Sequence, residues 1–251
     1  MLLLVSSLGW AQETVPGLVT DRPDQTESAV VVPLKSLQIE TGFLFEGDNT
    51  NSVRQNSFNF NTTLFRYGLF DRMELRLGLA FLSVKDNVNT DSLKTSKGFA
   101  PLYTGFKILV IEERGLIPQI AFLGGMVLPF TAAKEFKANY AAPVMRFAFS
   151  NTLSDDLSLG YNLGAEWYGD SAIPDYYYSL SLGYSINPKL GSFIESYGHI
   201  PGEGDAAHLV DAGFTYLVRN NFQVDISGGL GLNKAATDGF LSFGFTYRIP
   251  N

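Results

Sequence analysis

The 251-residue sequence predicts an all-β protein, an antiparallel transmembrane β-barrel of about twelve strands. Apolar and small polar residues alternate along many segments, as in Tyr178–Ile186, and this alternation has the period of a β-strand. The links between these segments are alternately short and long, which is how outer-membrane barrels connect their strands. Aromatic residues make up 14% of the chain, yet no apolar run approaches the length of about 18 residues that a membrane helix needs.

The composition excludes several classes of function. A net charge of −7 without a basic cluster argues against nucleic-acid binding, because phosphates attract a basic patch. The chain has no cysteine, so disulfides and thiolate metal sites are excluded. No residue pattern points to a metal ion or another cofactor, and we expect none.

The N-terminus has the pattern of a secretory signal. Leu2 to Leu8 form a short apolar core, and Gly9-Trp10-Ala11 place small residues at the two positions that a signal peptidase reads. We therefore expect residues 1–11 to be a signal peptide cleaved after Ala11. The basic start of such a peptide is missing, so either the apolar start arises by chance or Met1 lies within a longer signal, and the second reading is favoured.

The rest of the chain is predicted to form one domain, because no linker divides it. We expect residues 12–34 to be a periplasmic N-terminal segment and residues 35–251 to be the barrel. An exported barrel belongs in the outer membrane of a Gram-negative bacterium, surrounded by outer-membrane lipid.

The predicted strands are long enough to cross a bilayer at a tilt. Their number is even, so both ends of the barrel lie at the rim of short turns, which is the periplasmic rim. The predicted strands cover residues 35–46, 55–67, 72–84, 99–111, 116–129, 141–152, 156–168, 176–187, 189–198, 207–219, 221–232 and 239–249.

The connections differ in length according to the rim on which they lie. The short turns are predicted at Gly68–Asp71, Glu112–Gly115, Leu153–Asp155, Asn187–Pro188 and Asn220. The longer external loops are predicted at Gly47–Arg54, Lys85–Gly98, Phe130–Tyr140, Gly169–Asp175, His199–Ala206 and Asn233–Asp238.

The polar face of the strands is predicted to line the lumen. It is rich in serine and glycine, whereas a solvated outer face would be rich in Lys and Glu. In Tyr178–Ile186 the apolar residues then face lipid, and the serines and Gly183 face inward. The strand Lys189–Gly198 is ambiguous, because Phe193, Glu195 and Tyr197 share one face.

Charged residues of both signs fall on the predicted inner face. They could line a pore that favours cations or polar neutral solutes, since carboxylates outnumber bases. They could instead pair into a network that braces the interior, and this reading is favoured over conduction alone. The predicted lumen residues are Glu40, Glu74, Arg76, Lys107, Arg146, Glu166, Asp211, Asp225 and Arg248.

The last predicted strand resembles the signal that the outer-membrane insertion machinery recognises in its clients. The pattern of polar, glycine, aromatic and apolar residues is given by Ser242, Gly244, Tyr247 and Ile249. The chain departs from that signal because it ends the strand with Ile249 rather than Phe and continues with Pro250-Asn251. The resemblance implies the insertion machinery as a partner.

Several motifs near the N-terminus resemble those of a known family. They are Thr20–Ser28, Val30–Pro33, Leu37–Gly42, Phe65–Leu69 and Glu74–Arg76. Together they are similar to the outer-membrane β-barrel family labelled putative meta-pathway of phenol degradation, or transporter. The resemblance implies an outer-membrane channel or transporter for small-molecule solutes, with hydrophobic or aromatic compounds among the candidates.

The charged stretch before the first strand is open to two interpretations. As a plug, it would place Asp21, Arg22, Asp24 and Glu27 against charges inside the barrel. As a solvated leader, it would merely follow the signal peptide. The family resemblance includes this stretch, and a loop sequence that recurs in a family usually makes contacts, so the plug and the leader stand as equal alternatives.

Two other functions compete with a channel. One is a closed barrel with a structural or adhesive role for its loops. The other is a lipid-modifying enzyme, for which His199 and His208 are the available histidines. The chain has no G-x-S-x-G nucleophile motif, and histidines in loops are usually solvated, so we expect no enzymatic activity and no catalytic residue.

Overall fold

The computed structural model describes residues 16–50, 53–87 and 93–249. The predicted signal peptide at 1–11 and the dipeptide Pro250-Asn251 lie outside the described residues. No helix in the described ranges has the length and hydropathy of a membrane span.

The described residues form thirteen strands, all antiparallel to their neighbours, and two short 3₁₀ helices. In chain order these are β1 (Leu37–Thr50), β2 (Val53–Phe70), β3 (Met73–Asn87), β4 (Leu93–Phe99), β5 (Leu102–Ile111), β6 (Gln119–Leu128), η1 (Pro129–Thr131), η2 (Lys134–Phe136), β7 (Ala142–Thr152), β8 (Leu157–Glu166), β9 (Asp175–Asn187), β10 (Leu190–Ile200), β11 (Ala207–Arg219), β12 (Phe222–Gly231) and β13 (Gly239–Ile249).

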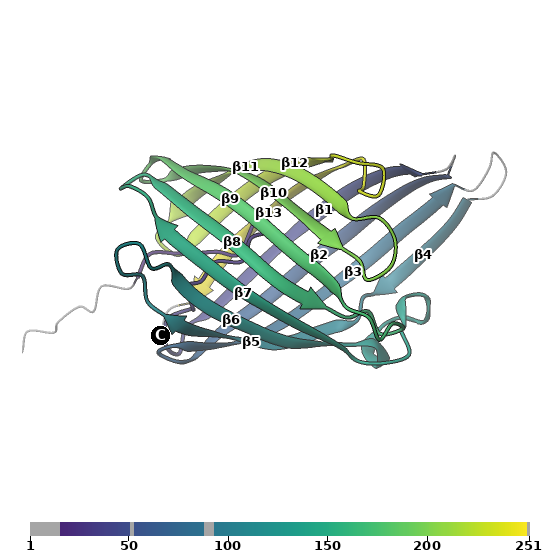
Figure 1. Cartoon of the computed structure of the whole chain (residues 1–251), viewed down its shortest axis with the longest axis horizontal. Helices are drawn as coiled ribbons and strands as arrows, with labels where there is room; N and C mark the ends of the chain where they lie inside the picture. Colours follow the sequence, from purple (N-terminus) through teal and green to yellow (C-terminus); the bar gives the residue numbers. More distant parts are fainter. Residues whose placement is uncertain (1–15, 51–52, 88–92, 250–251) are drawn as a thin grey trace, which may run out of the picture.

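The strands close into a twelve-stranded barrel, which confirms the predicted fold (Figure 1). β4 and β5 are two parts of one barrel strand, because both pair with β3. The interruption between them falls at Ala100-Pro101, and proline has no N–H to donate to the ladder. Closure follows from β1, which pairs with β2 on one side and with β13 on the other.

Most residues of the first two predicted external loops lie in strands. The stretch Gly47–Arg54 lies largely in strands, since β1 runs to Thr50 and β2 begins at Val53. The stretch Lys85–Gly98 is likewise mostly β3 and β4. Their polar sequences suggested loops, but a strand that extends beyond the lipid no longer needs an apolar face. The described ends of β1 to β4 project past the rest of the barrel (Figure 1).

The outer face is apolar and the inner face is polar, as the alternation predicted. In β9, Leu180 is 51% exposed whereas its neighbours Ser179 and Ser181 are 3% and 4% exposed. The ambiguous strand is also resolved, because Ile194 faces outward and Glu195 is buried inside. The largest fully buried side chains are accordingly polar or charged, with Arg66 and Lys107 first among them by volume.

The two faces of β11 should respond very differently to an added charge. Phe214 is 54% exposed on the outer face, and Thr215 lines a cavity in the lumen. We expect Phe214→Arg to lower the free energy of unfolding by about 2–4 kcal/mol, because it places a charge on the lipid face. Thr215→Arg should lower the free energy of unfolding much less, because it places the charge in the lumen. Urea unfolding of each variant in vesicles measures the difference, and equal losses would contradict the assignment of faces.

Candidate functional site

Residues 16–33, called here the N-terminal segment, run inside the barrel (Figure 1). At the turn rim, Arg248 of β13 donates hydrogen bonds to the carbonyls of Pro16 and Gly17. Farther in, the segment contacts strands on opposite walls. Its residues therefore meet two different chemical surroundings.

On one wall the segment meets the basic cluster, defined as Arg66 of β2, Arg76 of β3 and Lys107 of β5. All three side chains are almost fully buried. Asp21 contacts each of them, with N···O distances of 3.0 Å to Arg66, 2.7 Å to Arg76 and 2.9 Å to Lys107. Glu27 adds a 2.7 Å ion pair with Arg76. The segment thus supplies two carboxylates to three buried bases.

Carboxylates of the same wall hold the backbone of the segment. Glu40 accepts a hydrogen bond of 3.0 Å from the backbone N–H of Asp21, and Glu74 accepts one of 2.8 Å from that of Val32. Both carboxylates also pair with Arg66 at 2.8 Å. A buried charge is costly unless it is paired, and this network pairs every member.

The ion pairs set the charge state of the segment. Burial alone would raise the pKa of Asp21, but Arg66, Lys107 and Arg76 together hold that pKa well below its usual range. The contribution of Asp21 to holding the segment is therefore present above its ordinary pKa and is lost as the pH falls through the lowered value. Burial raises the pKa of Glu27, and the charge of Arg76 opposes that rise.

Arg22 fixes the segment to the neighbouring strands β12 and β13. Its guanidinium lies 2.8 Å from Asp225 and donates a 3.1 Å hydrogen bond to the Ser242 hydroxyl. A Cβ atom at Gly42 or Gly244 would overlap this guanidinium. Both glycines therefore provide the space that Arg22 occupies.

The opposite wall binds the segment through neutral groups and one carboxylate. Glu195 of β10 accepts a 2.7 Å hydrogen bond from the backbone N–H of Gln25 and another from the Thr26 hydroxyl. Asn162 of β8 makes two hydrogen bonds to the backbone of Glu27, one to its N–H at 2.7 Å and one to its carbonyl at 2.9 Å.

The structure places most of the predicted lumen residues deep inside the barrel. Two of them, Arg146 and Glu166, are less buried and lie 4.0 Å apart nearer the loop rim. Arg146 also lies over the ring of Tyr177, 3.9 Å from its centre. The residues that are buried on the inner face are Glu40, Glu74, Arg76, Lys107, Asp211, Asp225 and Arg248.

Two central residues of the site, Arg66 and Glu195, were not among the residues that the sequence predicted to line the lumen. Arg66 follows a register shift in β2 between Phe60 and Thr63, and such a bulge breaks the alternation that assigns faces. A usable signal was its position between Phe65 and Tyr67, which point outward.

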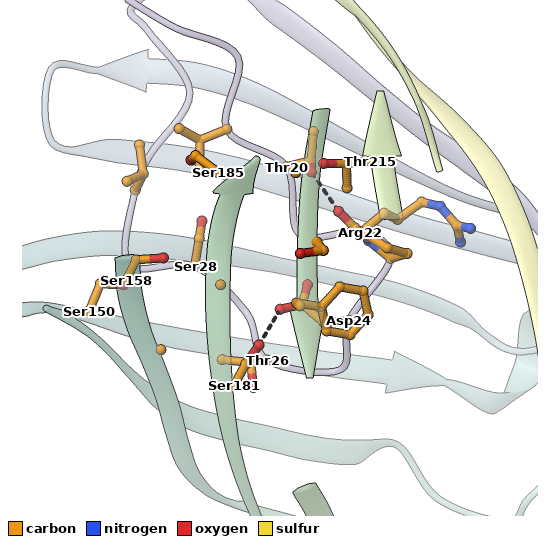
Figure 2. A pocket seen from close by; sticks show the side chains of 18 of the residues that line it. Thr20, Arg22, Asp24, Thr26, Ser28, Ser150, Ser158, Ser181, Ser185 and Thr215 are labelled. Carbon is orange, nitrogen blue, oxygen red and sulfur yellow. Dashed lines mark hydrogen bonds between the residues drawn. The ribbon is translucent and has the colours of Figure 1, made fainter. Parts of the chain in front are cut away.

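The N-terminal segment lies between two cavities of the lumen. The turn-side cavity has a volume of about 340 Å³, and the loop-side cavity has about 310 Å³. Arg22 and Glu27 line both of them. Figure 2 shows the turn-side cavity, where alternate residues of the segment stand near hydroxyl groups of the wall. The labelled wall residues are Ser150, Ser158, Ser181, Ser185 and Thr215.

The two histidines do not form a catalytic triad with serine among the described residues. His199 Nδ1 lies 3.5 Å from a carboxylate oxygen of Glu166. His208 Nδ1 lies 2.7 Å from the Tyr178 hydroxyl, within hydrogen-bond distance. No described group of three or more His, Cys, Asp or Glu has the arrangement of a metal site.

A closed antiparallel barrel with an apolar outer face and a charged interior defines an integral outer-membrane β-barrel protein of Gram-negative bacteria. Residues 20–249 match the profile of the family described as "Putative MetA-pathway of phenol degradation", and the chain belongs to that family. This confirms the resemblance that the N-terminal motifs indicated.

Solved structures share the fold at low sequence identity. An outer membrane channel from Pseudomonas putida F1 has a TM-score of 0.69 and 14% identity, covering 87% of this chain and 97% of that chain. The translocator domain of the autotransporter NalP from Neisseria meningitidis has a TM-score of 0.55 and 12% identity, covering 85% of this chain and 88% of that chain. The NanC porin has a TM-score of 0.52 and 12% identity, covering 85% of this chain and 100% of that chain. No curated protein matched the sequence.

Proposed function

We propose that the protein is an outer-membrane channel for small solutes and that residues 20–28 act as its plug. The observation that carries this proposal is the position of the N-terminal segment between the turn-side and loop-side cavities. A segment that merely braced the wall would not need to cross the lumen between two cavities. The Pseudomonas putida protein of similar fold is itself described as a channel, which supports the proposal.

The chemistry of the lumen supports a preference among solutes. Inner-face carboxylates outnumber bases, so cations and polar neutral solutes should pass more readily than anions. The family description refers to phenol degradation, which makes small aromatic compounds a reasonable class to test.

Solute uptake into proteoliposomes tests the function. The folded barrel is compared with protein-free liposomes for a sugar-sized neutral solute, a small organic cation and benzoate. We expect uptake of the neutral and cationic solutes above the protein-free rate and slower uptake of benzoate. The absence of uptake, both with and without residues 20–28, would favour a closed structural or adhesive barrel instead.

We also propose that β13 carries the signal for insertion into the membrane. Tyr247 and Ile249 are exposed on the outer face, where another protein can reach them, whereas Ser242 faces inward. Tyr247→Ala should reduce assembly of the barrel in cells without reducing the stability of the barrel that does assemble. Fractionation of cell envelopes measures assembly, and undiminished assembly would contradict the role.

A further inference from the structure

Three carboxyl groups meet where the N-terminal segment contacts β10 and β11. Glu195 and Asp211 lie directly opposite each other on these two strands. Both are 2% exposed and face the lumen. Residues opposite each other in an antiparallel pair have Cβ atoms about 4.5–5.5 Å apart, which brings the two carboxyls together. Asp24 of the segment adds the third carboxyl and binds the Ser181 hydroxyl at 3.1 Å.

No base neutralises these carboxyls among the described residues. None of the ion pairs in the described ranges includes Asp24, Glu195 or Asp211, although Asp21 on the other wall has three. Both oxygens of Asp211 are buried without a hydrogen-bond partner from the described part of the chain. Ionised carboxylates accept hydrogen bonds but cannot donate them. Two carboxyl groups can therefore bond to each other only when one of them holds a proton.

The groups around the three carboxyls do not supply the missing charge. Arg22 is held by Asp225, and Arg146 lies over the ring of Tyr177. The remaining neighbours are neutral or acidic except the imidazole of His199, whose Nδ1 lies 3.5 Å from Glu166. From β8, β9, β10 and β1 these are Asn162, Glu166, Tyr177, Ser181, Tyr197, His199 and Glu46.

We propose that Asp24, Glu195 and Asp211 form a proton-dependent latch, which holds the N-terminal segment while the three carboxyls share a proton and loosens it when that proton leaves. The proton passes to water in the turn-side cavity, which Asp24 lines. Like charges within one site repel strongly when all are ionised. Glu195 bonds Gln25 and Thr26, so repulsion at this point acts directly on the segment.

The charge state of Asp24 supports the latch. Burial inside the barrel and the neighbouring charge of Glu195 raise the pKa of Asp24 well above its usual range. Its contribution to holding the segment is therefore present at low pH and is lost as the pH rises toward the raised value. Asp21 on the other wall has the opposite dependence, so the segment should be held most tightly at intermediate pH.

The latch predicts that the segment loosens as the pH rises. The chain has no cysteine, so a nitroxide on Val19→Cys labels one site in the full barrel. Val19 is exposed at the turn side, and only its backbone carbonyl takes part in a hydrogen bond. We expect the ratio of mobile to immobile label to rise about tenfold between about pH 6 and about pH 9, because carboxyls that share a site interact by about one pK unit or more.

Amide variants separate the latch from general loosening. Asp211→Asn and Glu195→Gln keep the shape and hydrogen-bonding oxygens but cannot ionise, so each should flatten the pH response. Asp225→Asn is the matched control, because it removes a buried carboxylate that Arg22 neutralises. That control should raise label mobility at every pH and should still show the rise in mobility between the lower and the higher pH. A pH-independent label in the unmodified background, or a full step in both amide variants, would overturn the latch.

The latch rests on the proposed plug function only for its effect on transport. Conductance recorded on the same samples distinguishes the two ideas. Mobility and conductance that rise together support both. If label mobility follows pH and conductance does not, the latch is supported and the plug function is wrong.

Discussion

Replacing Asp21 with alanine should open the barrel. Asp21 is the one carboxylate of the N-terminal segment that contacts Arg66, Arg76 and Lys107 together. Removing one partner of a buried ion pair typically costs about 3–5 kcal/mol, because the other charges remain buried without compensation. That cost falls on the bound state of the segment, since the released segment leaves the cluster open to water. We therefore expect single-channel recordings to show a mostly open state.

The exposed pair of Arg72 and Glu112 provides the control. These side chains lie 3.5 Å apart at a turn and are about half exposed. Surface pairs contribute about 0–1 kcal/mol, so Glu112→Ala should leave conductance unchanged. If Asp21→Ala behaves like Glu112→Ala, the basic cluster does not hold the segment.

Replacing Arg66 with methionine should destabilise the whole barrel. Arg66 contacts Asp21, Glu40 and Glu74 and is completely buried. Methionine has a similar length but no charge, so three carboxylates would lose a buried counter-charge. We expect the free energy of unfolding in urea to fall by about 3–5 kcal/mol.

Arg72→Met is the matched control for this loss, because it removes an arginine from the exposed turn. The loss of unfolding free energy in Arg72→Met should not exceed about 1 kcal/mol. A small loss in both variants would mean that the interior network contributes little to stability and that packing of the outer face dominates.

Much of the fold could be predicted because a membrane barrel imposes strict alternation on each strand. In β9 the contrast between leucine and serine assigned both faces correctly. The rule weakens where strands leave the lipid, which is why the ends of β1 to β4 were taken for loops. It also fails at bulges, because one extra residue reverses the faces that follow.

The candidate site could be predicted only in part. The charges of Asp21 and Glu27 mark the N-terminal segment as unusual, but nothing local shows which wall they meet. Those contacts join residues as far apart in sequence as Arg22 and Asp225, and the closure of the barrel determines them. Glu195 was missed because aromatic neighbours on its own face concealed the polar side of β10.

Single-channel conductance of the folded barrel in a planar bilayer, measured with and without residues 20–28, decides whether this segment blocks the lumen. The deletion removes Asp21, Arg22, Asp24 and Glu27 together and leaves every strand intact. A plug predicts low conductance for the complete chain and a steady, severalfold higher conductance after the deletion. Equal conductance of the two proteins, with folding verified by circular dichroism, would show that residues 20–28 do not block the lumen.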